Sequence, residues 1–138
     1  MRIVLDTNVL VSGLLNPDGN PGRVLDLFLA GDVTLVVDDR VLAEYRAVLA
    51  RPKFGFDAFD VSDLLSLIET ESVRVAAPPL GIVVPDEGDL PFIEVAIAGE
   101  AEVLVTGNVR HFRRSAGIPV FVETPAEFVH RWPERKGA

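Results

Sequence analysis

Five short apolar runs rich in β-branched residues alternate with longer stretches whose apolar side chains recur at helical spacing. The runs are continuously apolar, as expected of strands that are buried on both faces of a sheet. They lie at Ile3–Leu5, Leu35–Val37, Val73–Val75, Val103–Val105 and Val120–Val122. Strands that alternate with helices favour a parallel sheet covered by helices on both faces. The sequence therefore predicts an α/β protein with a central parallel sheet of about five strands.

Local signals indicate where the helices between these strands begin and end. The apolar stripes cover Val24–Leu29, Val41–Leu49, Leu64–Ile68 and Phe92–Ile97. Asp39 and Ser62 are candidate N-terminal caps, and Gly99 is a candidate C-terminal stop. The stretch from Ala76 to Asp89 is rich in proline and glycine, which predicts a loop.

Length and composition indicate one ordinary globular domain over residues 1–138, with a mobile tail from about residue 132. The chain is 49% hydrophobic and 25% charged. It contains no cysteine, which excludes disulfides, zinc–cysteine sites, iron–sulfur clusters and cysteine nucleophiles. No apolar run approaches a membrane span and no secretory signal is evident, so we expect a cytoplasmic protein without membrane contact.

The net charge of −8 argues against a protein that coats DNA, which would carry a broad basic face. It is compatible with a nucleic-acid enzyme, because a metal site lined by carboxylates adds negative charge of its own.

Polar side chains follow three of the predicted strands at the point where each strand ends. Asp6-Thr7-Asn8 follows the first strand, Asp38-Asp39 the second, and Thr106-Gly107-Asn108 the fourth. In an open parallel sheet, the carboxyl ends of the strands border the crevice in which ligands bind. Glu44 borders a helical stripe and Asp89 precedes one. The residues that can converge on this edge are Asp6, Glu44, Asp89 and Asn108.

Each of these residues also has an ordinary structural interpretation. Asp6, Asp89 and Asn108 could each cap the segment that follows. Glu44 could be a solvated residue or could pair with Arg40 or Arg51. Asp86 is typical of a turn, although it is a reserve ligand.

The chemistry of the group favours a hard divalent cation. Clustered carboxylates repel one another unless a cation is present. Oxygen ligands without cysteine or a histidine pair suit Mg²⁺ or Mn²⁺ better than zinc. Such a site is suited to phosphoryl transfer, because the metal neutralises the phosphodiester and stabilises the leaving oxygen.

Four stretches in order resemble the motifs of the PIN domain family. The first is Ile3–Gly13, IVLDTNVLVSG. The others are Leu42–Tyr45 with Leu49–Phe54, Asp86–Phe92, and Val103–Asn108 with His111-Phe112. Four motifs in order at domain spacing are far more specific than any one of them. Within the family, the chain is most similar to the VapC-like toxins of bacterial and archaeal toxin–antitoxin pairs.

This resemblance implies a three-layer α/β/α sandwich and a ribonuclease that depends on Mg²⁺ or Mn²⁺. Asp6, Glu44 and Asp89 match the family's main acidic positions and are the expected metal ligands and catalytic residues. Asn108 stands where many PIN nucleases carry a fourth acid, which removes one charge and weakens a second metal site. The expected supporting residues around the site are Asn8, Thr106 and Asp86.

The mechanistic hypothesis gives each residue a role. Asp6 and Asp89 anchor the ion, Glu44 positions or deprotonates a water molecule, and Asn108 holds the water around the metal. The resemblance also implies a homodimer and a cognate antitoxin protein as partners, with RNA as the substrate.

Basic and aromatic residues suggest further contacts. Those predicted to meet the RNA backbone are Arg110, His111, Arg113 and Arg114. A weaker basic patch contains Arg46, Arg51 and Lys53. Phe54, Phe56 and Phe59 form either a hydrophobic plug or an exposed patch for a protein partner.

Two other functions stay open on the sequence. The first is a PIN-fold module that binds RNA or protein with weak or absent catalysis, for which the only support is Asn108. The second is a phosphatase with Asp6 as the nucleophile. The sequence argues against it, because Asn8 stands where the haloacid-dehalogenase phosphatases carry a second aspartate.

Overall fold

The sheet has five parallel strands, and its central strand is the first one in the chain. The computed structural model describes residues 1–81, 84, 86–113 and 118–136. The strands are β1 (Arg2–Leu5), β2 (Thr34–Val37), β3 (Val73–Arg74), β4 (Val103–Val105) and β5 (Phe121–Glu123). Their order is β3-β2-β1-β4-β5, and each neighbouring pair is parallel. The predicted α/β fold with a five-stranded parallel sheet is confirmed.

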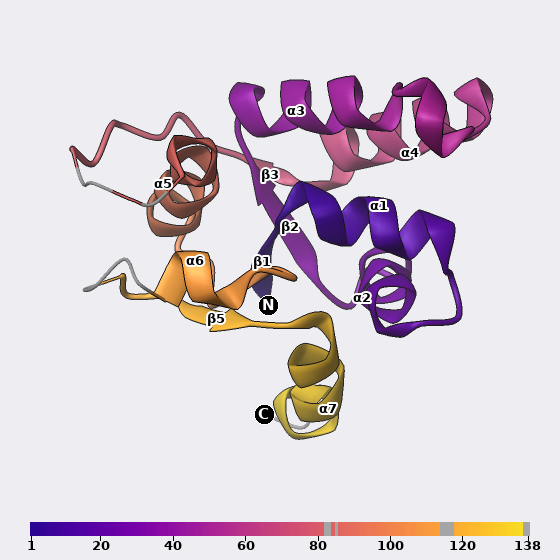
Figure 1. Cartoon of the computed structure of the whole chain (residues 1–138). Coiled ribbons are helices and arrows are strands. Elements are labelled where there is room, and N and C mark those ends of the chain that lie inside the picture. The colour runs from indigo at the N-terminus through magenta and orange to yellow at the C-terminus, as the bar shows by residue number, and fades with distance from the viewer. Residues whose placement is uncertain (82–83, 85, 114–117, 137–138) are drawn as a thin grey trace.

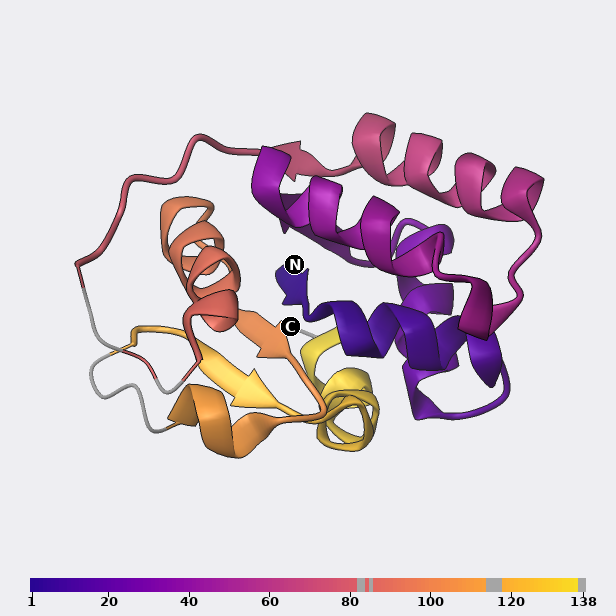
Figure 2. The same cartoon turned by 45° about the horizontal axis from the view of Figure 1, so that its top comes forward.

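Helices cover both faces of this sheet (Figure 1). They are α1 (Thr7–Leu15), α2 (Asn20–Leu29), α3 (Asp39–Leu49), α4 (Ala58–Glu71), α5 (Leu90–Ala98), α6 (Val109–Arg113) and α7 (Pro125–Lys136), with the 3-10 turns η1 (Pro52–Phe54) and η2 (Glu87–Asp89). One group contains α3, α4 and α5, of which α5 packs on β1, β2 and β4. The other contains α1, α2 and α7. Figure 2 shows α3 and α4 running side by side. The result is a three-layer α/β/α sandwich.

The strand order places a crevice at the carboxyl end of β1. The chain leaves β1 for β2 on one side and later returns to β4 on the other, which creates the switch point where open sheets bind ligands. Leu5 is paired with Val105 in register, and the amide of Asp6 donates to the carbonyl of Val105 at 3.0 Å. Asp6 and Thr106 therefore leave the sheet side by side.

Two helix starts differ from the prediction. Asp38, not Asp39, caps α3, because its carboxylate accepts from the amide of Val41 at 2.9 Å. Asp57 caps α4 by accepting from the amides of Phe59 and Asp60, so the helix begins well before Ser62. In both cases the carboxylate that reaches the free N–H groups sets the first turn.

Gly99 ends α5 as predicted. A Cβ at this position would lie 2.2 Å from Cγ1 of Val36, so close packing on β2 also requires the glycine.

The outer strands and the C-terminus also differ from expectation. β3 ends at Arg74, and β5 begins one residue later than predicted. Residues 132–136, which were predicted to belong to a mobile tail, form the last turns of α7. Trp132 stacks on Phe128 with the ring centroids 5.9 Å apart, and Arg135 pairs with the buried Glu123. Residues 137–138 lie outside the described part.

The three clustered phenylalanines do not form one plug. Phe54 and Phe56 stack with their ring centroids 5.6 Å apart, whereas Phe59 at the start of α4 is 82% exposed.

Within the part of the chain described here, none of the helices is long and apolar enough to cross a membrane.

Candidate acidic site

Asp6 is held at the mouth of the crevice by its neighbour on β4. The residue is only 8% exposed, and its Oδ2 accepts from the Thr106 hydroxyl at 2.7 Å. Although Asp6 precedes α1, its side chain makes no capping hydrogen bond to that helix. Burial raises the pKa of Asp6, the Thr106 hydrogen bond opposes this, and the charges of Glu44 and Asp86 raise it further. The structure therefore gives no support to the capping interpretation of Asp6.

Thr106 connects the two strand ends. Its fully buried hydroxyl donates to Asp6 and accepts from the backbone amide of Asn108 at 3.0 Å. Asn8 contributes from α1, where its Oδ1 accepts from the amide of Gly107 at 3.5 Å. Two of the three predicted supporting residues, Asn8 and Thr106, therefore contact the turn that carries Asn108, whose own side chain is exposed.

Glu44 reaches the crevice from α3. It is half-buried, and its Oε2 accepts from the hydroxyl of Thr7 at the start of α1. Neither alternative ion pair forms in the described part of the chain, where Arg40 instead contacts Asp38 and Glu94 at 2.8 and 2.7 Å. The carboxylate of Glu44 is thus oriented by a neutral hydroxyl donor, and among the described residues it forms no ion pair.

Asp89 lies at the N-terminus of α5, close to Asp86 and His111. One ligand atom from each of these three residues lies within 4.8 Å of the other two. Asp89 makes no capping hydrogen bond, and its buried Oδ2 has no hydrogen-bond partner. The Nδ1 of His111 is 3.6 Å from this oxygen, which is too long for a hydrogen bond. An orphaned carboxylate oxygen among other ligand atoms fits a divalent cation.

The charges at this edge act on one another. The pKa of Asp89 is raised to about 6, first by burial and then by the charges of Asp6 and Asp86, whereas the charge of His111 lowers it. Glu44 adds a smaller contribution in the same direction. Asp6 and Glu44 therefore act on Asp89 electrostatically, but in the described residues they join no three-residue group as tight as that of Asp86, Asp89 and His111.

The predicted RNA contacts fall into different environments. Arg110 is exposed and lines a cavity of about 390 Å³ with Asn108 and His111. Arg113 instead makes contacts within the protein. It donates to the carbonyl of Val122 at 2.9 Å and lies 3.4 Å from Glu127 of α7. Arg114 lies outside the described residues.

Two features near the site were not predicted from the sequence. Glu94 of α5 is buried, and it accepts from Arg40 and from the amide of Leu80, both at 2.7 Å. The buried Tyr45 donates to the carbonyl of Leu5 at 2.6 Å, next to Asp6. A lone acid within the apolar helix Leu90–Ala98 was the available signal for Glu94, because such a residue needs a partner.

Comparison with known proteins agrees with this geometry. The sequence matches the PIN domain family over residues 2–110, which include every acidic residue of the site. The chain belongs to the PIN domain family.

Two relatives extend the comparison. The chain is 28% identical to the uncharacterized protein MJ1680 of Methanocaldococcus jannaschii, over 96% of this chain and 92% of that protein. A chain in the crystal structure of VapBC2 from Rickettsia felis, bound to a DNA fragment from their promoter, has a similar fold. The TM-score is 0.59 at 22% identity, and the match covers 90% of this chain and 98% of that one.

Replacing Thr106 with valine tests how much the site depends on the hydroxyl that holds Asp6. We expect Thr106→Val to lower the affinity for Mn²⁺ about 10- to 100-fold, because Asp6 loses its donor and the Asn108 amide loses its acceptor. Calorimetric titration with Mn²⁺ measures this affinity in the wild type and in the variant. Thr70→Val on α4 is the matched control, since its hydroxyl contacts only a helix carbonyl. An equal loss in both variants would contradict the assignment.

The raised pKa of Asp89 predicts a pH-dependent stability in the absence of metal. The pKa of Asp89 in the folded protein, about 6, exceeds the ordinary value of 3.8, so protonation of Asp89 stabilises the folded state. This stabilisation is complete below pH 3.8 and is lost as the pH rises through 6. We expect Asp89→Asn to raise the free energy of unfolding at pH 7 by about 1–2 kcal/mol and to leave it nearly unchanged at pH 4. Urea unfolding in chelator measures both values. A stabilisation of equal size at the two pH values would contradict the prediction.

Proposed function

We propose that this protein is an endoribonuclease that depends on a divalent metal and hydrolyses phosphodiester bonds of single-stranded or loop RNA. The observation that carries the proposal is the buried, unpartnered oxygen of Asp89, a residue that forms a group with Asp86 and His111 in which one ligand atom of each lies within 4.8 Å of the other two. Asp6 and Glu44 lie close enough to raise the pKa of Asp89. Membership of the PIN domain family supports the proposal, because proteins of this family are generally nucleases.

The site residues have two proposed roles, which are to bind a cation and to activate the attacking water molecule. Asp6 and Asp89 would hold Mg²⁺ or Mn²⁺, with Glu44, Asp86 and His111 in reach of its coordination shell. The ion would supply charge neutralisation of the phosphodiester and of the leaving oxygen. Thr106 fixes the rotamer of Asp6 through its hydroxyl, so that Asp6 meets the ion without reorganising.

Glu44 is the candidate general base. The Thr7 hydroxyl engages Oε2 and orients the carboxylate, so that Oε1 can accept a proton from a water molecule. That water would attack phosphorus in line with the departing O3′, forming the new P–O bond while the P–O3′ bond breaks. The products carry a 5′-phosphate and a 3′-hydroxyl. The exposed side chain of Asn108 would order water near the ion.

The cellular role proposed here is that of a toxin with a cognate antitoxin protein. The support is the fold shared with a chain in the VapBC2 structure, together with family membership. A homodimer in the cytoplasm, where RNA is the substrate, is part of the same proposal.

Cleavage of a mixed pool of single-stranded RNA tests the activity. We expect cleavage in Mg²⁺ or Mn²⁺, none in chelator, and products that a 5′-phosphate-dependent exonuclease degrades. Cleavage that persists in chelator would overturn the proposal. RNA binding that survives chelator without cleavage in any metal would favour a binding module instead.

A further inference from the structure

Most arginines of this acidic chain are already engaged by carboxylates. The ion pairs join Arg40 to Asp38 and Glu94, Arg46 to Glu69, Arg74 to Asp39, Arg113 to Glu127, and Arg131 and Arg135 to Glu123. Within the described part of the chain, Arg51 and Lys53 enter no ion pair, and both are exposed. Two adjacent uncommitted cations on a chain of net charge −8 form a local site for an anion.

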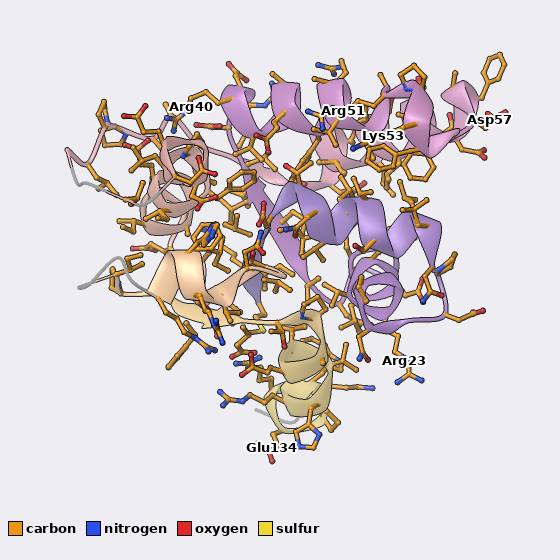
Figure 3. All side chains as sticks on the ribbon, viewed as in Figure 1. Arg23, Arg40, Arg51, Lys53, Asp57 and Glu134 are labelled. Carbon is orange, nitrogen blue, oxygen red and sulfur yellow. The ribbon has the colours of Figure 1, made fainter. Side chains whose placement is uncertain are left out.

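Arg51 follows the C-terminal end of α3, the helix that carries Glu44. It lies seven positions after Glu44 and two residues beyond the last residue of α3. The amide of Ala50 closes the last α-helical turn on the carbonyl of Arg46, whereas the amide of Arg51 donates to the carbonyl of Val48 in a tighter turn, and the backbone is extended at Arg51. Figure 3 shows Arg51 and Lys53 beside α3, whereas Arg23 projects from the opposite side of the molecule near α2. Glu44 and Arg51 are therefore separated by little more than the last turn of α3 and the short turn that ends it.

Arg51 also lines a cavity of about 420 Å³ between α3, η1 and α4. Its walls combine Phe56 and aliphatic side chains with the hydroxyls of Ser62 and Ser66 and the Arg46–Glu69 pair. Phe56 stacks on Phe54 at an interplanar angle of 20°, and the Nζ of Lys53 lies 5.0 Å from the Phe54 ring centroid. An aromatic stack next to free cations is the combination that binds single-stranded nucleic acid.

We propose that this cavity is a nucleotide-binding subsite for the RNA strand. Arg51 and Lys53 bind a backbone phosphate near the cleaved bond, and the attached base enters the cavity and stacks on Phe56. The cavity has the size of a small-ligand site. Its hydroxyls and its charged pair offer partners to the edge of a base, which an aliphatic side chain of a protein partner would leave unused. The identity of the ligand as RNA rests on the proposed function.

RNA binding in chelator tests the subsite apart from catalysis, with a fluorescent single-stranded RNA and anisotropy as the readout. We expect Phe56→Leu to weaken binding about tenfold, because leucine keeps the apolar volume but removes the stacking face. We expect the Arg51→Gln, Lys53→Gln double variant to weaken binding and to lower the slope of log affinity against log salt by about 1. Arg23→Gln, another exposed cation without an ion pair in the described residues, is the matched control and should bind RNA like the wild type.

Failure of this subsite can be told apart from failure of the proposed function. Hydrolysis of bis(p-nitrophenyl) phosphate by the wild type in Mn²⁺ reports on the acidic site alone, because this small diester cannot span to Arg51. Weaker RNA binding by the variants supports the subsite even if the diester is not hydrolysed. Unchanged RNA affinity in the double variant overturns it, even if the diester is hydrolysed. The double variant alters only exposed residues, so this result stands even if Phe56→Leu unfolds.

Discussion

Replacing Asp6 with asparagine should reduce metal-dependent RNA cleavage by at least about 100-fold while leaving the protein as stable as before, or more stable. Asparagine can still accept from Thr106, so the packing at the end of β1 persists. The change removes a buried carboxylate whose pKa is raised by burial. It also removes the repulsion between this carboxylate and those of Glu44 and Asp86. Loss of activity together with retained stability is expected where a charge serves function at the expense of stability.

The assay compares initial cleavage rates in Mn²⁺ and thermal unfolding in chelator. Asp39→Asn is the matched control, because Asp39 is a carboxylate at the same sheet edge whose side chain is 90% exposed and 3.8 Å from Arg74. We expect it to cleave at the wild-type rate. If Asp6→Asn cleaves RNA as fast as this control, Asp6 is not a ligand of the catalytic ion.

Glu94→Ala should destabilise the protein by about 2–4 kcal/mol. The buried carboxylate bridges Arg40 of α3 and the amide of Leu80, so its removal leaves both donors without their acceptor. Because Asp89 lies five residues earlier at the start of the same helix, we also expect weaker Mn²⁺ binding. Chemical denaturation measures the first effect, and calorimetric titration measures the second.

Glu69→Ala provides the comparison for this prediction. Glu69 also pairs with an arginine, Arg46, at 2.6 Å, but both members of this pair are substantially exposed. Removing an exposed pair costs about 0–1 kcal/mol. Equal destabilisation by the two substitutions would show that burial of Glu94 does not strengthen its contacts.

Residues with a local signal were placed correctly from the sequence. The five strands follow from continuous apolar runs, which only a doubly covered sheet accommodates. Gly99 was identified by its position after an apolar stripe. The helix starts at Asp38 and Asp57 were missed, because several nearby polar residues fit the capping pattern equally well. Only the backbone geometry decides which carboxylate reaches the free amides.

The roles of the charged residues needed the tertiary structure. His111 follows Asp89 by twenty-two positions, and only the tertiary fold brings α6 and the start of α5 together at these two residues. Arg113 has the same chemistry as Arg110, but α7 supplies it with Glu127. A charged side chain carries no local indication of whether its partner is solvent, substrate or another part of the chain.

The sequence by itself determined the sheet, its buried strands and the set of acids delivered to one edge, because periodicity and strand-end position are local properties. Only the tertiary structure decided that Thr106 holds Asp6, that Thr7 holds Glu44 and that one oxygen of Asp89 is left without a partner. These contacts join residues far apart in the chain. Their geometry depends on how β1, β4 and α3 pack, which no single stretch of sequence specifies.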